Sequence, residues 1–214
     1  MKVEIIPAVR IKICGITNTK DAAAAVELGA DAVGFVLASS PRQVSPEKAR
    51  EIIMALPPFV QSVGVFVDED PEKVASTAAF CRLDLLQFHG KESPAYCRGF
   101  GQRVIKAVWV QNQGGLEACA EYGSVVDALL LDTYELGRRG GTGLTFDWNL
   151  ALKAKKYGRI ILAGGLNPDN VAEAISAARP YAVDASSGLE QEPGVKDHDK
   201  MARFIRAVRH AVRG

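Results

Sequence analysis

Residues 159–188, RIILAGGLNPDNVAEAISAARPYAVDASSG, contain one complete unit of the pattern that decides the fold. Two short runs rich in apolar residues, 159–163 and 181–185, flank an alanine-rich segment. The runs are nearly continuous rather than alternating, which is typical of parallel strands buried on both faces. The stretch therefore predicts a strand, a helix and a second strand parallel to the first.

The same unit recurs along the whole chain, at intervals of roughly 20 to 30 residues. The eight predicted strands cover residues 10–16, 32–37, 61–67, 83–89, 103–110, 128–133, 159–163 and 181–185. Eight units without a break in composition predict one domain over residues 1–214, a closed (β/α)₈ barrel of the TIM type. The alternative is an open doubly wound sheet, but that fold usually carries a glycine-rich turn after its first strand. In this chain the glycines cluster late.

Four predicted helices begin with the same local chemistry. The sequences SPEK, DPEK, SPAY and NPDN each place a capping residue before proline, at Ser45, Asp70, Ser93 and Asn167. Such a side chain accepts from a first-turn amide, and proline lacks the hydrogen that would be unpaired there. A last helix with an apolar stripe is predicted over about residues 198–213.

The composition excludes several classes of function. The 214 residues include 26 Lys and Arg against 25 Asp and Glu, so the net charge of +1 points to neither nucleic acid nor an anionic membrane as a partner. Any anion site must therefore be local. No stretch approaches the roughly 20 apolar residues of a membrane span, and the N-terminus lacks the apolar centre of a signal peptide, so the cytoplasm is the expected compartment. Monomer and homodimer both remain open.

The four cysteines are widely spaced, at Cys14, Cys81, Cys97 and Cys119. None forms a C-x-x-C pair, and the chain has only three histidines. Neither a zinc site nor a disulfide framework is therefore predicted, and four free thiols are expected.

In a (β/α)₈ barrel the functional site lies at the C-terminal ends of the strands, where the following loops surround a common mouth. The predicted strand ends are polar although the strands themselves are apolar. They carry Cys14, Arg42, Gln87, His89, Asp132, the AGG turn at 163–165 and the VDASSG stretch at 183–188, which includes Asp184. This polar ring predicts the site.

The loops after the seventh and eighth strands are suited to phosphate, which barrel enzymes often bind there. Gly164, Gly165 and Gly188 would let backbone amides approach an anion, and Ser186 and Ser187 would add hydroxyl donors. Each glycine cluster alone is unremarkable, because glycine is common in turns. Their occurrence after both strands predicts a phosphate site.

Strand alternation places Lys12 and Cys14 on one face of the first strand and Ile11 and Ile13 on the other. If the isoleucines pack against the helices, Lys12 and Cys14 face the barrel axis. An ammonium group favours a nearby thiolate, so Lys12 is expected to lower the pKa of Cys14 and make it a usable base. The alternative is that Cys14 is a small core residue.

Asp132 ends the run ALLLD. Its apolar setting is expected to raise its pKa, so that it retains a proton for general acid catalysis; the alternative is a carboxylate that caps the next loop.

The planar fork of Arg42 suits a carboxylate, unless Arg42 is a solvated surface residue. Lys12, Gln87 and Asp184 are candidates for substrate binding. So is His89, which a structural role would explain equally well and which is given no catalytic role.

Several motifs together resemble phosphoribosylanthranilate isomerase of tryptophan biosynthesis. They are KICGIT, DAVGFV, SPRQVSPEKAR, LQFHG, LLLDT, GGTGLTFDW, LAGGLNPDNV and VDASSGLE…PGVKD, and the match runs from about Val9 to the C-terminus. The resemblance implies that Cys14 is the general base, that Asp132 is the general acid and that Arg42 meets the anthranilate carboxylate. It also assigns the phosphate to the glycine and serine amides named above. Leu144 departs from the pattern, since many relatives carry lysine there, and the first eight or so residues exceed the usual start.

The implied reaction is an Amadori rearrangement of N-(5-phosphoribosyl)anthranilate to 1-(2-carboxyphenylamino)-1-deoxyribulose 5-phosphate. Asp132 would protonate the ribose ring oxygen and open the ring to an iminium, and Cys14 would remove the proton from C2. Because the iminium is itself the electron sink, no metal, nucleotide or pyridoxal cofactor is implied.

Two rival classes remain. One is an isomerase of the histidine pathway, or a dual-substrate enzyme, which typically has an aspartate base where this chain has Cys14. The other is a non-catalytic barrel that binds a phosphorylated metabolite, and such a barrel is expected to lose Cys14 or Asp132.

Overall fold

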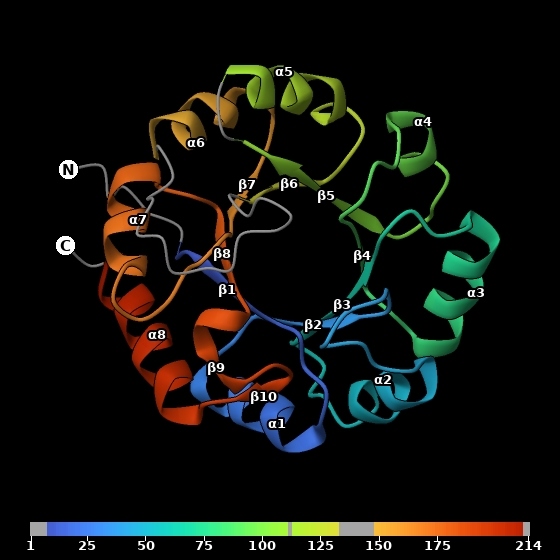
Figure 1. Ribbon diagram of the computed structural model, residues 1–214, viewed down its shortest axis with the longest axis vertical. Coiled ribbons are helices and arrows are strands. Elements are labelled where there is room, and N and C mark those ends of the chain that lie inside the picture. The colour runs from blue at the N-terminus through green and yellow to red at the C-terminus, as the bar shows by residue number, and fades with distance from the viewer. Residues whose placement is uncertain (1–7, 111–112, 133–147, 212–214) are drawn as a thin grey trace.

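Eight parallel strands close into a barrel in the computed structural model, which describes residues 8–110, 113–132 and 148–211 (Figure 1). The strands are β1 (Arg10–Cys14), β2 (Ala32–Val36), β3 (Gln61–Phe66), β4 (Leu85–Phe88), β5 (Arg103–Trp109), β6 (Ala128–Asp132), β7 (Ile160–Leu162) and β8 (Ala182–Ala185). They pair in chain order, and β8 pairs with β1 to complete the ring. Each strand lies within its predicted range, and the (β/α)₈ barrel is confirmed.

Helices surround the barrel (Figure 1). They are α1 (Thr19–Leu28), α2 (Pro46–Ile53), α3 (Pro71–Cys81), α4 (Pro94–Cys97), α5 (Gln113–Tyr122), α6 (Trp148–Ala154), α7 (Val171–Ala178) and α8 (His198–Ala211). Two 3₁₀ turns, η1 (Lys155–Tyr157) and η2 (Ser187–Leu189), and a hairpin of β9 (Glu190–Glu192) and β10 (Val195–Lys196) complete the described elements. Over the described ranges, no helix has the length and apolar character needed to cross a membrane.

Three of the four predicted helix starts are confirmed. The side chains of Ser45, Asp70 and Ser93 each accept a hydrogen bond from a first-turn amide, and proline follows each of them. The fourth prediction was wrong, because α7 begins after Asn170 rather than after Asn167. The side chain of Asn167 instead accepts from the backbone N–H groups of Asp169 and Asn170, and this tight turn delays the helix.

Two apolar layers stabilise the barrel. Alternate strand residues point outward and pack under the helices, and this layer includes Ile11 and Ile13, as predicted. The other strand residues point toward the barrel axis and form a second, smaller apolar cluster, which includes Val63, Ile105 and Leu130. The four cysteines are buried free thiols, as expected. The axial layer ends below the mouth, where polar side chains replace apolar ones.

Candidate active site

Lys12, Cys14 and Asp184 lie together at the mouth, on the axial side of β1 and β8. Nζ of Lys12 donates to Oδ2 of Asp184 at 3.0 Å, and both side chains are at least nine-tenths buried. Cys14 is also buried. A Cβ placed on Gly34 of β2 would lie 2.8 Å from Sγ of Cys14 and 3.1 Å from Cε of Lys12. The absence of a side chain at Gly34 therefore makes room for both groups on the axis.

The pKa of Cys14 differs from the value expected from the sequence. Burial raises the pKa of Cys14 above its ordinary value, and the lowering effect of Lys12 does not offset it. Lys12 acts on Cys14 in the predicted direction, but the prediction that it would make Cys14 a usable base near neutrality was wrong, because burial outweighs it. Burial lowers the pKa of Lys12, but Asp184 and Cys14 together raise it above its ordinary value. Lys12 is thus a charged neighbour to a thiol that holds its proton at neutral pH.

A second polar group joins β4 to β6. Nε2 of His89 lies 3.2 Å from Oδ2 of Asp132, and Nδ1 of His89 lies 3.0 Å from Nε2 of Gln87. The amide nitrogen of Gln87 can only donate, so Nδ1 is the acceptor and Nε2 carries the proton that faces Asp132. The structure therefore brings these three predicted site residues together, through one hydrogen bond and one close contact between ring nitrogen and carboxylate.

Two buried oxygens at the mouth have no partner within the described part of the chain. They are Oε1 of Gln87 and Oδ1 of Asp184. Buried acceptors are nearly always satisfied in folded proteins, so each is suited to a donor from a bound molecule.

Arg42 lies in the loop after β2, and its partly exposed side chain is held by an acidic partner. Its Nε donates to Oε1 of Glu190 at 2.8 Å, and its Nη2 donates to Oε2 at 2.7 Å. Glu190 also accepts from Nζ of Lys196 at 2.8 Å, and the Lys196 side chain is fully buried. A Cβ on Gly15, whose φ is +75°, would lie 2.7 Å from Cδ of Arg42. The glycine after Cys14 thus admits Arg42 to the mouth.

Glu190 and Lys196 are site residues that the sequence reading missed. Both stand in the stretch VDASSGLE…PGVKD, but nothing local indicates that the β9–β10 hairpin turns their charges toward Arg42. The cations on either side lower the pKa of Glu190 despite its burial. Burial lowers the pKa of Lys196, and Glu190 opposes this effect. Four charged residues, Glu190, Glu192, Lys196 and Asp197, stand close together in this stretch, and this clustering is the signal that a charged group belongs to the site, although it does not say which of them takes part.

The loops after β7 and β8, which hold the predicted phosphate residues, lie against each other. Gly164 and Gly165 have φ values of +80° and +69°, a conformation that side chains rarely adopt. A Cβ on Gly188 would overlap the carbonyl oxygen of Leu166, so the close approach of the two loops requires glycine at position 188. Ser187 begins the turn η2 directly after β8. Two glycine-rich loops and the start of a short helical turn form the arrangement in which many barrels hold phosphate.

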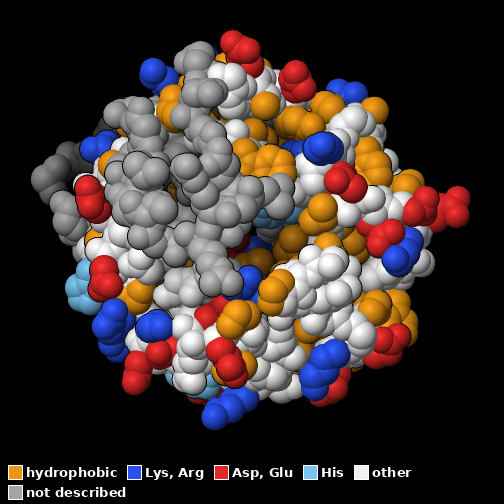
Figure 2. Space-filling view, in the orientation of Figure 1, with side chains coloured by type: hydrophobic (Ala, Val, Ile, Leu, Met, Phe, Trp, Pro, Cys, Tyr) orange, Lys and Arg blue, Asp and Glu red, His pale blue; other side chains and the backbone are white. Residues whose placement is uncertain are grey.

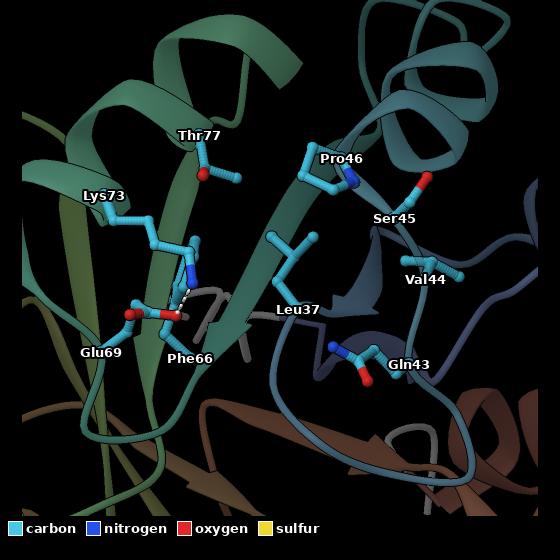
Figure 3. A pocket seen from close by; sticks show the side chains of 9 residues that line it. All are labelled: Leu37, Gln43, Val44, Ser45, Pro46, Phe66, Glu69, Lys73 and Thr77. Carbon is cyan, nitrogen blue, oxygen red and sulfur yellow. Dashed lines mark hydrogen bonds and ion pairs between the residues drawn. The ribbon is translucent and has the colours of Figure 1, made fainter.

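The view down the barrel shows a hollow at its centre, bordered by charged and hydrophobic side chains (Figure 2). A separate cavity of about 460 Å³ lies between the loop after β2 and helix α3 (Figure 3). Leu37 and Phe66 line it, and Lys73 pairs with Glu69 at 2.7 Å within it. None of the predicted site residues lines this cavity.

Across the described ranges, no group of three or more His, Cys, Asp or Glu side chains is placed to hold a metal ion. Leu144 and residues 1–7 lie outside the described residues.

The fold and the mouth define the class of protein: a (β/α)₈-barrel enzyme with candidate acid and base groups at the C-terminal ends of its strands. The family model for N-(5'-phosphoribosyl)anthranilate (PRA) isomerase matches residues 11–207, and this chain belongs to that family.

Individual relatives agree with this assignment. The N-(5'-phosphoribosyl)anthranilate isomerase of Geobacter metallireducens is 54% identical over 202 residues, which are 94% of this chain and 99% of that protein. The crystal structure of the Thermotoga maritima enzyme is 49% identical, with a TM-score of 0.89 over 94% of this chain and 99% of that one. A second structure from T. maritima, 46% identical with a TM-score of 0.85 and the same coverage, is of monomers generated from the dimeric enzyme. A phosphoribosyl anthranilate isomerase in complex with reduced 1-(o-carboxyphenylamino)-1-deoxyribulose 5-phosphate is 47% identical, with a TM-score of 0.85 and the same coverage.

Proposed function

We propose that this chain isomerises N-(5'-phosphoribosyl)anthranilate to 1-(2-carboxyphenylamino)-1-deoxyribulose 5-phosphate, a step of tryptophan biosynthesis, and that it does so in the cytoplasm. The observation that carries the proposal is the presence of a buried thiol with an adjacent ammonium and of a histidine-bound carboxylate in one barrel mouth of this family. These groups suit an acid–base rearrangement of a phosphorylated sugar.

In the proposed reaction, Asp132 gives a proton to the ribose ring oxygen as the bond from C1 to that oxygen breaks. The lone pair of the anthranilate nitrogen forms the iminium at C1. Cys14, as thiolate, then takes the proton from C2, and the electrons of that bond reduce the iminium to an enamine. The enamine is the enol of the product, and its tautomerisation gives the C2 ketone. Lys12 favours the thiolate that this step needs.

The substrate is proposed to lie across the mouth. The glycine and serine residues after β7 and β8, namely Gly164, Gly165, Ser186, Ser187 and Gly188, would hold its phosphate. Buried Oδ1 of Asp184 and Oε1 of Gln87 would accept from ribose hydroxyl groups. Arg42, held by Glu190, would meet the anthranilate carboxylate.

Purified protein given N-(5'-phosphoribosyl)anthranilate tests the proposal directly, through the loss of anthranilate-type fluorescence as product forms. Expression in a tryptophan auxotroph lacking this step should restore growth, whereas a histidine auxotroph lacking the corresponding isomerase should stay dependent on histidine. Growth of the histidine auxotroph alone would favour the histidine-pathway rival. Tight binding of a product analogue without turnover would favour the non-catalytic barrel.

We further propose that the chain forms a homodimer through the N-terminal end of the barrel. Phe59, between α2 and β3, is 94% exposed. It borders a cavity of about 290 Å³ whose other walls include Leu85, Ile105 and Tyr181. Arg10, Asp31 and Arg103 also line the cavity, so it is apolar only in part. An exposed aromatic ring beside a partly apolar cavity on one face suits a two-fold interface, in which each ring enters the cavity of the other copy. The dimeric state of the Thermotoga maritima enzyme supports this proposal.

Sedimentation velocity tests the assembly. The wild-type protein should sediment as a dimer, and Phe59→Glu should sediment as a monomer of unchanged secondary structure. Phe80→Glu is the matched control, because Phe80 is also exposed but does not line the cavity. A wild-type monomer, or a dimer that survives Phe59→Glu, would contradict this interface.

A further inference from the structure

A buried ion pair lies outside the barrel axis and takes no part in the reaction described above. Nζ of Lys106 lies 2.9 Å from Oε2 of Glu92, and their side chains are 3% and 1% exposed. Lys106 alternates along β5 with Ile105 and Ala107, which belong to the axial layer, so its side chain is on the helix-facing side. The pair therefore cannot touch a substrate in the mouth.

Burial of such a pair does not by itself account for its presence. Removing two charges from water costs about as much as their attraction returns, and apolar residues of similar size often stabilise a protein equally well. What distinguishes the Glu92–Lys106 pair is the backbone that it holds.

The pair binds both peptide groups that flank His89. Oε2 of Glu92 accepts from the N–H of Gly90 at 3.0 Å, and Nζ of Lys106 donates to the carbonyl of Phe88 at 3.4 Å. Nζ also donates to the carbonyl of Gly90 at 2.6 Å. The N–H of His89 itself donates to the carbonyl of Phe66 on β3 at 2.9 Å. The backbone on each side of His89 is thus fixed from the helix-facing side.

Two neighbouring elements hold the pair in turn. Oε1 of Glu92 accepts from the N–H of Asp68, in the loop after β3, at 2.8 Å. The Tyr122 hydroxyl of α5 donates to the carbonyl of Glu92 at 2.9 Å, and the Tyr122 ring centroid lies 5.6 Å from Nζ of Lys106. The turn after β4 is therefore tied to β3, β5 and α5 at once.

The imidazole of His89 extends from this turn to Asp132, with Nε2 3.2 Å from Oδ2. We propose that the Glu92–Lys106 pair is a positioning element, which sets His89 and through it the orientation of the Asp132 carboxyl toward the substrate. This inference rests on the proposed function, because it takes Asp132 to be the general acid. Glu92 and Lys106 act through His89 and are not catalytic residues.

The test uses Glu92→Leu/Lys106→Met, which removes the Glu92–Lys106 pair, the clamp on the backbone around His89, and leaves no unpaired buried charge. Its kcat should fall about ten- to a hundredfold, because a displacement of about 1 Å in a reacting group costs up to about 10²-fold in rate. Its KM should stay within about twofold of wild type, since neither residue reaches the mouth. Glu92→Gln/Lys106→Met, which keeps an acceptor for Gly90 and also leaves no buried charge unpaired, is the second variant if the first does not fold, and its kcat should fall in the same direction.

Asp127→Ala is the matched control. Asp127 accepts from the N–H of Val104 at the other end of β5, at 2.8 Å, so its loss should affect stability and leave kcat unchanged. The decisive comparison repeats the clamp variants in a His89→Ala background. If the clamp acts through His89, they should cause no further fall in kcat there, because coupled residues give non-additive effects.

Wild-type kcat in both clamp variants would overturn the inference, as would a fall of equal size with and without His89. Asp132→Asn separates this result from failure of the proposed function. If Asp132→Asn keeps full turnover, the assignment of the acid is wrong. If Asp132→Asn is inactive while the clamp variants turn over normally, the acid assignment stands and the positioning role fails.

Discussion

Arg42 donates three hydrogen bonds to Glu190: Nε lies 2.8 Å from Oε1 and 3.1 Å from Oε2, and Nη2 lies 2.7 Å from Oε2. The same carboxylate accepts from Lys196 at 2.8 Å, so one acidic group pairs with two cations beside the mouth and the three side chains together carry a net charge of +1. The hydrogen bonds to Glu190 fix the orientation of the planar Arg42 guanidinium beside the mouth.

Glu190→Gln should destabilise the protein. The substitution leaves the fully buried Lys196 ammonium without a counter-charge, and breaking a buried pair from one side costs about 3 to 5 kcal/mol. Urea unfolding would measure the change. Glu51→Gln is the control, since Glu51 pairs with Lys48 at the surface, where a pair contributes about 0 to 1 kcal/mol. Equal effects of the two substitutions would mean that the Glu190 network adds nothing to stability.

Arg42→Ala should mainly raise KM for the anthranilate-bearing substrate. Loss of a charge-assisted bidentate contact costs roughly 1.5 to 3 kcal/mol, which is about tenfold to a hundredfold in affinity. Affinity for inorganic phosphate should change little, because the proposed phosphate loops follow β7 and β8. Arg42→Lys should rescue poorly, since lysine lacks the planar fork. If Arg42→Ala abolished phosphate binding and kept affinity for the aromatic end of the product, Arg42 would belong to the phosphate site.

Cys14→Ala should lose nearly all turnover and still bind product analogues. Removal of a general base commonly costs about 10² to 10⁴ in rate. Because burial raises the pKa of Cys14, only a minority of molecules carries the thiolate at neutral pH. The wild-type kcat/KM should therefore rise with pH above neutrality. Turnover that persists in Cys14→Ala would return this residue to a packing role, and a flat pH profile would contradict the raised pKa.

Asp132→Asn should abolish catalysis with little change in stability. The amide keeps the shape of the carboxyl group and can still contact His89, but it cannot deliver a proton to the ring oxygen. Steady-state kinetics and a thermal melt on the same preparation would measure both effects. Activity within a few-fold of wild type would make Asp132 only a loop cap.

The stability of the protein should fall between about pH 8.5 and pH 11. Burial raises the pKa of Cys97 and of Cys119 to about 11, whereas thiols in the unfolded chain ionise near 8.5. In this window the folded state binds more protons than the unfolded state, so the free energy of unfolding decreases as the pH rises. Urea unfolding at several pH values should show a shallower decrease for Cys97→Ala/Cys119→Ala than for wild type. Parallel curves would contradict the raised pKa values.

Sequence reasoning succeeded where local chemistry decides the outcome. The strands are apolar runs that only burial on both faces accommodates, and the caps at Ser45, Asp70 and Ser93 satisfy amides within one turn. It was wrong at Asn167, where a cap-like residue forms a separate tight turn before the helix. Both Asn167 and a true cap begin by accepting from amides two or three residues ahead. The turn that forms lies against Gly188, which is 22 positions later in the chain than Leu166 and which no local pattern brings there.

The sequence by itself determined the barrel, the end at which its site lies and the residues that face the axis. These features follow from strand alternation and from the repeat of the strand–helix unit, and both are set by residues close together in the chain. Only the tertiary structure decided how those residues pair. His89 meets Asp132, and Arg42 meets Glu190, across 43 and 148 positions of chain. The charge state of Cys14 was also decided there, because its pKa depends on how much water the surrounding strands exclude as well as on Lys12 beside it. Burial and long-range pairing are properties of the closed ring, and no local stretch contains them.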